Sequence, residues 1–373
     1  MFQNTRKLFD EFERLGIPGF DISVMQGGRE VFRESRGCSD ESGTPMRGTE
    51  RYNIYSCSKV ITCTAAMMLI EEGKLRLEDE LATYFPEFGN VRVRQGDGLV
   101  KAESPITIHQ LFTMTAGLCY DCSHEAVVRG RLETEGRAPT VEMMKYIAEI
   151  PLLYQPGETF HYSLGHDVLA AVVERISGKR YGEFVKERIF DPLGMKSTTF
   201  LLPDEECDTL MAQYRFVEGK FNNVGRKIQT YKLGSEYESG GAGAVSTVDD
   251  YVRFLEGLRT YRLLKRDTLE LMYRDHLRDD QRATCWVAEG YGYGLGVRAP
   301  RAGYPRTDFG WGGAAGAFAA IDPVNDISLY YSQHVLLSPN ANLRKDIIEA
   351  VKLDLGLPAF EESMWCGTAS TLA

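Results

Sequence analysis

The chain has 373 residues, of which 43 are Lys or Arg and 53 are Asp or Glu, so that its formal net charge is −10. This acidic balance argues against sequence-independent binding of nucleic acid, which needs cations to displace counterions from the phosphates. The apolar fraction of 43% and the aromatic fraction of 11% exclude wholesale disorder and indicate a globular protein.

Several features bear on the compartment of the protein. No apolar run approaches the roughly 20 residues that span a bilayer, so we expect no membrane partner. The N-terminal segment is charged and amphipathic and lacks the apolar core of a secretory signal, which predicts a cytoplasmic location for the sequence as given. The eight cysteines are too few for a disulfide scaffold, and we expect free thiols.

The first elements in chain order are a helix and a strand hairpin. Residues 4–15 have the spacing of an amphipathic helix, which Gly16 ends. Phe20–Met25 and Glu30–Ser35 are strand-like and flank the turn signal Gln26-Gly27-Gly28-Arg29.

Helices dominate the next part of the chain. A helix is predicted from about Ser56 to Glu72, where Gly73 stops it, with an inner stripe of Val60, Cys63, Met67 and Ile70. From about residue 76 to residue 230, loops rich in Pro and Gly separate helices that we expect at 141–149, 164–176 and 181–189.

The last part returns to strands. A helix is predicted from Val248 to Leu258, and another at 342–353. Between them, four strands are predicted at Gly294–Arg298, Thr307–Trp311, Ala315–Ile321 and Ile327–Gln333.

Strands near both termini with helices between them predict an α/β fold of the α+β type. In this fold, one antiparallel sheet of about five strands is built from both ends of the chain and flanked by helices. We expect a discontinuous sheet domain of residues 1–75 and 235–373, a mostly helical insert domain of residues 76–234, and an active site in the cleft between them.

The strongest chemical feature is Ser56-Cys57-Ser58-Lys59 at the start of a predicted helix. One helical turn separates Ser56 from Lys59, so both side chains project from the same face. A lysine whose pKa is lowered by desolvation can take the serine proton, and the helix N-terminus offers N–H groups where an oxyanion would form. The alternative is an N-cap serine beside an exposed lysine.

Two further segments could complete such a site. Tyr162 stands at the entrance of a predicted helix, where its hydroxyl can pass a proton between a serine and a lysine. The alternative is a packed tyrosine with a satisfied hydroxyl. The glycine-rich residues 309–316 let a substrate lie against backbone and offer an N–H to an oxyanion, or else form a sheet edge of small residues.

Rival constellations are weak. The chain has no Gly-x-Ser-x-Gly, which removes the usual nucleophile elbow of an α/β-hydrolase. Cys119 and Cys122 lie near His124, but the sequence offers no second pair of zinc ligands at a suitable spacing, so we expect no metal site. We interpret this segment as a loop that borders the cleft. We also expect no cofactor.

Nine short segments lie along the chain in this order: Ile17–Phe20, Tyr55–Lys59, Glu72–Asp79, Tyr84–Pro86, Ile106–Ile108, Thr115–Leu118, Phe160–Ser163, Asp191–Met195 and Gly240–Gly243. In these segments and their order, the chain from about residue 16 to residue 335 resembles the serine β-lactamase-like and penicillin-binding family, which includes class C β-lactamases, D-peptidases and a carboxylesterase branch.

This resemblance implies roles for particular residues. Ser56 corresponds to the nucleophile, Lys59 to its base partner, and Tyr162 to the hydroxyl that protonates the leaving group. Because Trp311-Gly312-Gly313 stands in place of the family's third motif, the backbone amides of Ser56 and Ala314 would form the oxyanion hole. The residues expected to contact substrate are Trp311, Gly313, Leu164 and Tyr120.

Two departures from the family pattern favour its esterase branch. The Tyr-x-Asn motif reads Tyr162-Ser163-Leu164, without the amide, and the Lys-Thr-Gly motif reads Trp311-Gly312-Gly313, without the cation that receives a substrate carboxylate. The resemblance therefore implies a carboxylesterase that forms an acyl-enzyme with small or medium uncharged acyl esters. A β-lactamase, a D-peptidase, an acyltransferase and an inactive ligand-binding relative remain alternatives.

Overall fold

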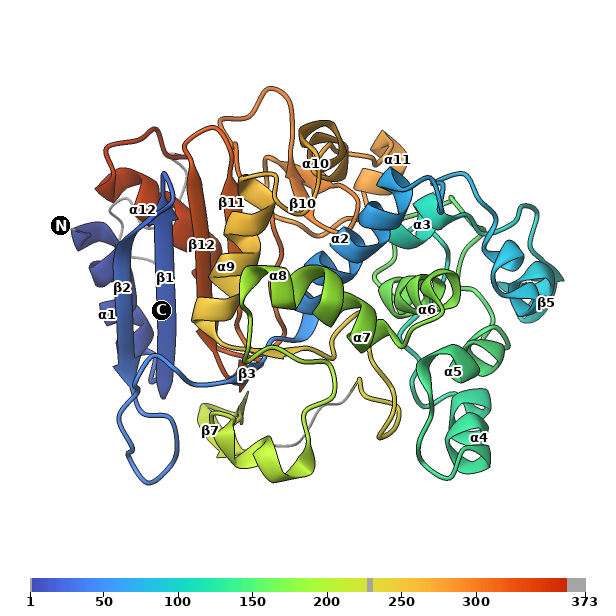
Figure 1. Ribbon diagram of the computed structural model, residues 1–373, viewed down its shortest axis with the longest axis horizontal. Helices are drawn as coiled ribbons and strands as arrows, with labels where there is room; N and C mark the ends of the chain where they lie inside the picture. The colour runs from blue at the N-terminus through green and yellow to red at the C-terminus, as the bar shows by residue number, and fades with distance from the viewer. Residues whose placement is uncertain (1, 227–230, 361–373) are drawn as a thin grey trace.

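A computed structural model describes residues 2–226 and 231–360, and a four-stranded antiparallel sheet lies at one side of it (Figure 1). The strands β1 (Gly19–Gln26) and β2 (Arg29–Gly37) form an N-terminal hairpin, and β11 (Phe318–Asp322) and β12 (Ile327–Gln333) form a second one. The order is β11-β12-β1-β2, so β1 joins the two hairpins by pairing with β12. The mixed α/β fold with a sheet built from both ends of the chain is confirmed.

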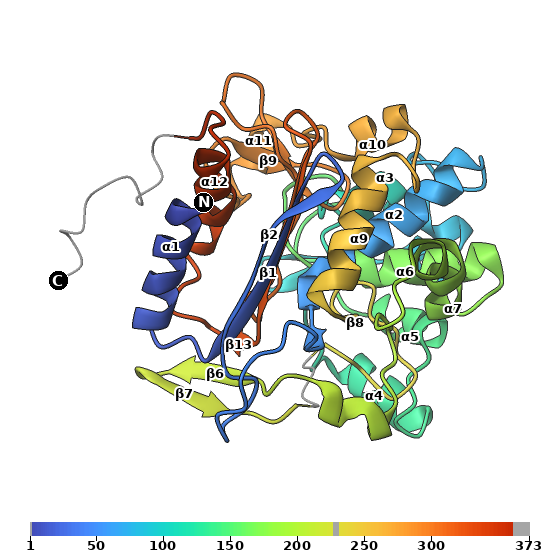
Figure 2. The same ribbon diagram turned by 60° about the vertical axis from the view of Figure 1, so that its left-hand side comes forward.

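Helices cover both faces of this sheet (Figure 2). On one face, α1 (Gln3–Arg14) packs beside α12 (Ile347–Asp354), and the Phe9 and Phe12 rings contact the sheet residue Phe20. On the other face, α9 (Val248–Arg259) contacts β1, β11 and β12. The predicted helix at 342–353 begins later than expected, because Arg344–Asp346 forms a 3-10 turn.

The helix α2 (Ser58–Glu71) is buried on all sides rather than along one stripe. Every residue from Ser58 to Leu69 is buried, whereas Ile70 of the predicted stripe is only partly so. The helix α2 packs against α6, α7 and α10, so its surface is covered by other helices and it has no solvent-facing polar side. A 3-10 turn at Tyr55–Cys57 precedes it, so the predicted helix start at Ser56 is a separate turn.

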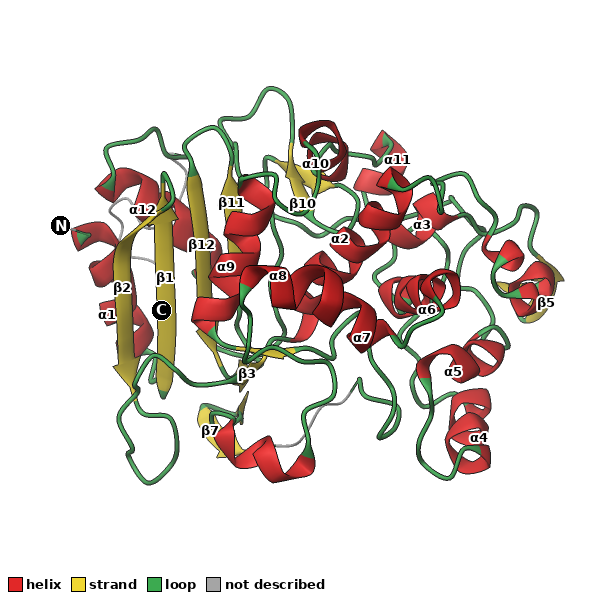
Figure 3. Cartoon of the chain, viewed as in Figure 1, coloured by secondary structure: helices red, strands yellow, loops and turns green. Residues whose placement is uncertain are grey.

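Helices with few strands fill the middle of the chain (Figure 3). They are α3 (Ile108–Phe112), α4 (Glu125–Glu133), α5 (Thr140–Ile147), α6 (Gly165–Ser177), α7 (Tyr181–Val185) and α8 (Asp191–Leu193). The predicted helix at 181–189 is instead α7 followed by a π turn, Lys186–Phe190. Two short helices, α10 (Arg266–Met272) and α11 (Asp279–Arg282), lie between α9 and β9. The division into two domains stays a prediction.

The remaining strands form small sheets away from the main one. These are β3 (Tyr52–Asn53) with β8 (Val245–Ser246), β4 (Arg92–Gln95) with β5 (Gly98–Lys101), β9 (Tyr291–Tyr293) with β10 (Arg298–Pro300), and β6 (Tyr214–Val217) with β7 (Lys220–Asn223) and β13 (Val335–Leu336). Within the described ranges, no helix combines the length and the apolar character needed to cross a bilayer.

The strands predicted between residues 294 and 317 are wrong in extent. Gly294–Arg298 is mainly the turn between β9 and β10, in which the Gly294 amide donates to the Val297 carbonyl at 2.8 Å. Thr307–Trp311 makes only isolated bridges, such as that of Phe309 with β11, so four continuous strands replace the expected five. Gly310 explains part of this, since its φ of 150° and a close approach to the Ala319 carbonyl depart from regular strand geometry.

Candidate active site

Ser56 lies in the 3-10 turn that precedes α2 and lines a cavity of about 580 Å³. The preceding residue, Tyr55, has a φ of 47°, a left-handed conformation that costs a non-glycine residue of order 1 kcal/mol or more. Burial of Tyr55 and a 2.8 Å hydrogen bond from its hydroxyl to Gln213 Oε1 hold this conformation. The strained turn thereby leaves Ser56 partly accessible at the end of a buried helix.

Lys59 is fully buried one helical turn after Ser56, which excludes the alternative of an exposed lysine. Its Nζ lies 3.3 Å from Ser56 Oγ, 2.9 Å from Tyr120 Oη and 2.6 Å from the Gly241 carbonyl oxygen. Burial lowers the pKa of Lys59 from 10.5 to about 8, although the nearby Asp167 acts in the opposite direction. Lys59 can therefore lose its proton near neutral pH.

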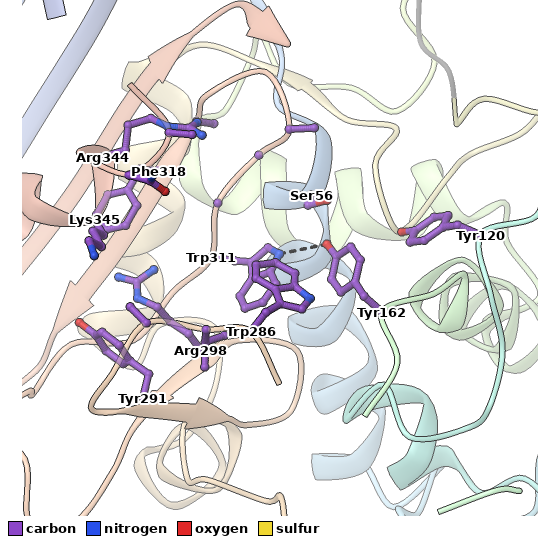
Figure 4. Close-up of a pocket in the computed structure, with 18 of the residues that line it drawn as sticks. Ser56, Tyr120, Tyr162, Trp286, Tyr291, Arg298, Trp311, Phe318, Arg344 and Lys345 are labelled. Carbon is purple, nitrogen blue, oxygen red and sulfur yellow. Dashed lines mark hydrogen bonds between the residues drawn. The ribbon is translucent and has the colours of Figure 1, made fainter. Parts of the chain in front are cut away.

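Tyr162 stands just before α6, and its hydroxyl faces the cavity near Ser56 (Figure 4). Trp311 Nε1 donates a hydrogen bond to Tyr162 Oη at 3.1 Å. Burial raises the pKa of Tyr162, and its hydrogen bonds with Ser56 and Trp311 offset only part of that effect. The phenol therefore stays protonated at neutral pH and can donate a proton.

The segment that was expected to supply the oxyanion hole lies in close backbone contact with the turn that contains Ser56. A Cβ on Gly313 would lie 2.4 Å from the carbonyl oxygen of Ile54, two residues before Ser56, so only glycine fits there. This contact brings Ala314, the next residue, to the same cavity as Ser56. Neither the Ser56 amide nor the Ala314 amide has a hydrogen-bond acceptor in the part of the chain that the structure describes. Both are free to bind an oxyanion.

Three of the four predicted substrate contacts line the cavity, and one does not. Trp311, Gly313 and Tyr120 are all part of its wall. Leu164 is fully buried in the hydrophobic core and is not part of the wall, so it cannot touch a substrate in this structure. It occupies the N-cap position of α6 without a side-chain capping hydrogen bond. At this position, the side chain packs inward and fills the core.

Sequence reasoning missed two neighbours of Lys59. The carbonyl of Gly241 accepts from Lys59, and a Cβ on Gly241 would lie 2.3 Å from Asp167 Oδ2. Asp167 is fully buried, and its Oδ1 accepts hydrogen bonds from Tyr237 and Ser239. The position of Asp167, five residues after Tyr162, did not predict its burial near Lys59, because an acidic residue in a helix usually faces solvent.

The wall of the cavity also contains residues that no motif indicated. Trp286 is 65% exposed and packs against Trp311 in a tilted arrangement and against Tyr162 edge to face, with ring centres 5.7 Å and 5.6 Å away. Arg298, Arg344 and Lys345 line the other end (Figure 4). No group of three or more His, Cys, Asp or Glu side chains within the described residues is arranged to hold a metal ion.

Known proteins resemble the chain over most of its length. The family model described as Beta-lactamase matches residues 5–350. Esterase EstB of Burkholderia gladioli is 30% identical over 298 residues, which cover 73% of this chain and 72% of that protein. Lovastatin esterase of Penicillium rubens is 27% identical over 81% of this chain and 84% of that protein.

A solved structure shows the same architecture. The structure described as EstCE1, a hydrolase with promiscuous acyltransferase activity, superimposes with a TM-score of 0.77. It covers 94% of this chain and 99% of its own, at 26% identity. Because the superposition covers nearly the whole of both chains, the fold as a whole is shared.

Proposed function

Because the chain belongs to the Beta-lactamase family, we propose that it is a serine esterase that cleaves small acyl esters through an acyl-enzyme on Ser56. The observation that carries this proposal is the fully buried Lys59, with its Nζ 3.3 Å from Ser56 Oγ and its pKa lowered to about 8. A serine hydroxyl becomes an effective nucleophile only when a neighbouring base can take its proton.

Acylation begins when the ester carbonyl oxygen enters the space between the Ser56 and Ala314 amides. Neutral Lys59 takes the proton of Ser56 as Oγ attacks the carbonyl carbon, and the two amides stabilise the negative charge that develops on oxygen. The hydrogen bonds from Lys59 to Tyr120 and to the Gly241 carbonyl fix the position of Nζ during this transfer.

Expulsion of the alcohol needs a proton donor on the leaving-group side. Tyr162 is protonated at neutral pH and faces the same cavity, so its hydroxyl can give its proton to the departing oxygen as the C–O bond breaks. Lys59, now charged, lies with Nζ 4.6 Å from the centre of the Tyr162 ring and can return a proton to the phenolate. Water then attacks the acyl-enzyme, and the same groups release the acid and restore Ser56.

Several observations favour esters over lactams and peptides. Trp311 occupies the place of the cation in the family's third motif, and its ring packs against Tyr162 with a centre-to-centre distance of 5.8 Å. Leu164, in the place of the motif's amide, is buried away from the cavity. An ester also needs less leaving-group assistance than an amide. The names of EstB and lovastatin esterase agree with this assignment.

A comparison of substrates tests the proposal. We expect kcat/KM for 4-nitrophenyl butyrate to exceed that for nitrocefin by at least about tenfold, a barrier difference of roughly 1.4 kcal/mol. The ester rate should disappear in Ser56→Ala, which serves as the control for background hydrolysis. Efficient nitrocefin hydrolysis with negligible ester turnover would instead assign the protein to the β-lactamase branch.

A further inference from the structure

An exposed tryptophan, Trp286, forms part of the wall of the cavity that contains Ser56. It is 65% exposed, and the other large apolar side chains that are exposed in the described part of the chain, such as Leu99 and Leu132, lie outside this wall. Exposed apolar surface in a binding cavity gains free energy when a ligand covers it. Trp286 therefore marks the part of the cavity where we expect an apolar group of the substrate.

Hydrogen bonds hold the segment before this indole against the part of the chain that leads to Tyr162. The Thr284 hydroxyl donates to the Phe160 carbonyl oxygen at 3.0 Å, two residues before Tyr162. Gln281, in α11, donates from Nε2 to the Gly157 carbonyl at 2.8 Å. Two segments that are far apart in the sequence are thus joined beside the cavity, and the indole has a fixed position relative to Tyr162.

Trp286 is the most exposed of three aromatic rings that pack together. Its ring meets Tyr162 edge to face, at an interplanar angle of 73°, and lies at 52° to the ring of Trp311. The Trp311 and Tyr162 rings stack on each other at 25° and are joined by the hydrogen bond from Trp311 Nε1 to the Tyr162 hydroxyl. Because Trp311 is buried and Tyr162 is only partly exposed, Trp286 offers most of the free ring surface (Figure 4).

The place of this ring relative to the reaction decides which part of an ester it can touch. In the proposed mechanism, the Tyr162 hydroxyl protonates the departing alcohol oxygen, so the group bonded to that oxygen lies beside Tyr162 and hence beside Trp286. Val287 and Ala288 follow the indole in the wall and add apolar surface there. The cationic residues of the wall lie at the other end of the cavity (Figure 4). The leaving-group side of the cavity is therefore apolar and aromatic.

We propose that Trp286 determines specificity for the alcohol part of the ester, by packing against an aromatic ring that the alcohol carries. The substrate class is thus esters of aromatic alcohols with small or medium acyl groups. Aromatic rings that pair in offset or edge-to-face geometry gain free energy beyond that of the apolar area they bury, so the exposed indole favours an aromatic over a saturated ring. The inference rests on the proposed esterase function and adds the side of the ester on which the ring lies.

Two pairs of uncharged esters test this inference, and the members of each pair differ only in the ring. Benzyl butyrate against cyclohexylmethyl butyrate places the ring on the alcohol, whereas ethyl 3-phenylpropanoate against ethyl 3-cyclohexylpropanoate places it on the acyl group. We expect the unmodified protein to prefer benzyl butyrate over cyclohexylmethyl butyrate at least about threefold in kcat/KM, mainly through a lower KM. The saturated ring is no less hydrophobic, so burial of apolar area alone predicts no such preference.

Variants connect this preference to the indole. Trp286→Ala should bring the ratio of benzyl to cyclohexylmethyl ester close to one, mainly by raising KM for the benzyl ester, whereas Trp286→Phe should keep part of the preference. Neither variant should change the ratio within the acyl pair. Leu132→Ala on α4 removes another exposed apolar side chain, outside the cavity, and should leave the preference for the benzyl ester intact.

The outcomes separate this inference from the proposed function. No preference for the benzyl ester, or a preference that persists in Trp286→Ala, would overturn it while esterase activity stands. Equal losses for both alcohol esters in Trp286→Ala would mean that the indole only supports Tyr162, and a preference confined to the acyl pair would place the ring on the wrong side, so either result would also overturn it. If no ester is hydrolysed and Ser56 does not react with a fluorophosphonate, the proposed function itself fails.

Discussion

The pH dependence of acylation should report the titration of the buried Lys59. Desolvation lowers the pKa of this lysine from 10.5 to about 8, and only the neutral amine can accept the Ser56 proton. We therefore expect kcat/KM to rise with pH up to about 8 and then to level off. Tyr162 should not produce a falling limb in the neutral range, because burial raises its pKa.

The magnitude follows from the two pKa values of Lys59. With a pKa of about 8, roughly one tenth of the molecules carry neutral Lys59 at pH 7, compared with about 0.03% for a pKa of 10.5. Burial thus increases the reactive fraction about 300-fold, which corresponds to roughly 3.4 kcal/mol at about 1.4 kcal/mol per pH unit. Below pH 7, kcat/KM should change about tenfold for each pH unit.

The assay is the second-order rate of acylation by an uncharged fluorophosphonate between pH 6 and 9.5, followed by intact mass. Such a probe does not titrate in this range, so the profile belongs to the protein. Lys59→Arg is the matched variant, because a guanidinium stays protonated at all these values. It should lose about 10²- to 10⁴-fold in rate. A profile that is flat from pH 6 to 9, or a Lys59→Arg rate near that of the unmodified protein, would refute the assignment of Lys59 as the base.

Three further predictions follow from the same geometry. Tyr162→Phe and Lys59→Ala should each reduce kcat by orders of magnitude, and the double variant should lose little more than the worse single one. Fully additive losses would show that the two residues do not act in the same proton-transfer step. Gly313→Ala should lower kcat at least about 10²-fold by pushing Ala314 away from Ile54, and near-normal turnover would argue against this oxyanion hole. Lys59→Met should raise the free energy of unfolding at pH 7 by up to about 3 kcal/mol in urea titrations, because protonated Lys59 destabilises the fold below pH 8. That gain should shrink between pH 8 and 10.5, where the lysine of the unmodified protein becomes neutral in both states, and a gain independent of pH would contradict the explanation.

The sequence predicted well what depends on local spacing. Ser56 and Lys59 are one helical turn apart, so any helical backbone puts them on the same side, and the structure brings Nζ within 3.3 Å of Oγ. Alternating apolar residues and the Gly27-Gly28 turn were enough to place β1 and β2.

Predictions from the sequence were wrong where glycines and loops determine the backbone geometry. The segment Thr307–Trp311 was predicted as a strand, but Gly310 makes it irregular and leaves only isolated bridges to β10 and β11. Leu164 was expected at the substrate because it follows Tyr162 by two residues, whereas the start of α6 turns its side chain into the core. In both cases a local pattern was overridden by tertiary packing.

The cationic end of the cavity could not be predicted at all from the sequence. Arg344 and Lys345 lie nearly 300 residues after Ser56, in a segment that resembles an ordinary charged helix start. That both line the same cavity as Ser56 is a property of the folded molecule. Sequence patterns identify groups that act through neighbours in the chain, but not cavities assembled from distant segments.

The central claim, that Ser56 is a nucleophile activated within this cavity, is tested most directly by intact-protein mass spectrometry after reaction with a fluorophosphonate. The proposal predicts one covalent adduct on the unmodified protein, located on Ser56 by peptide mapping. It also predicts no adduct on a folded Ser56→Ala variant, together with a loss of ester turnover of about three or more orders of magnitude. An adduct that persists in Ser56→Ala, or ester turnover that survives the substitution, would contradict it.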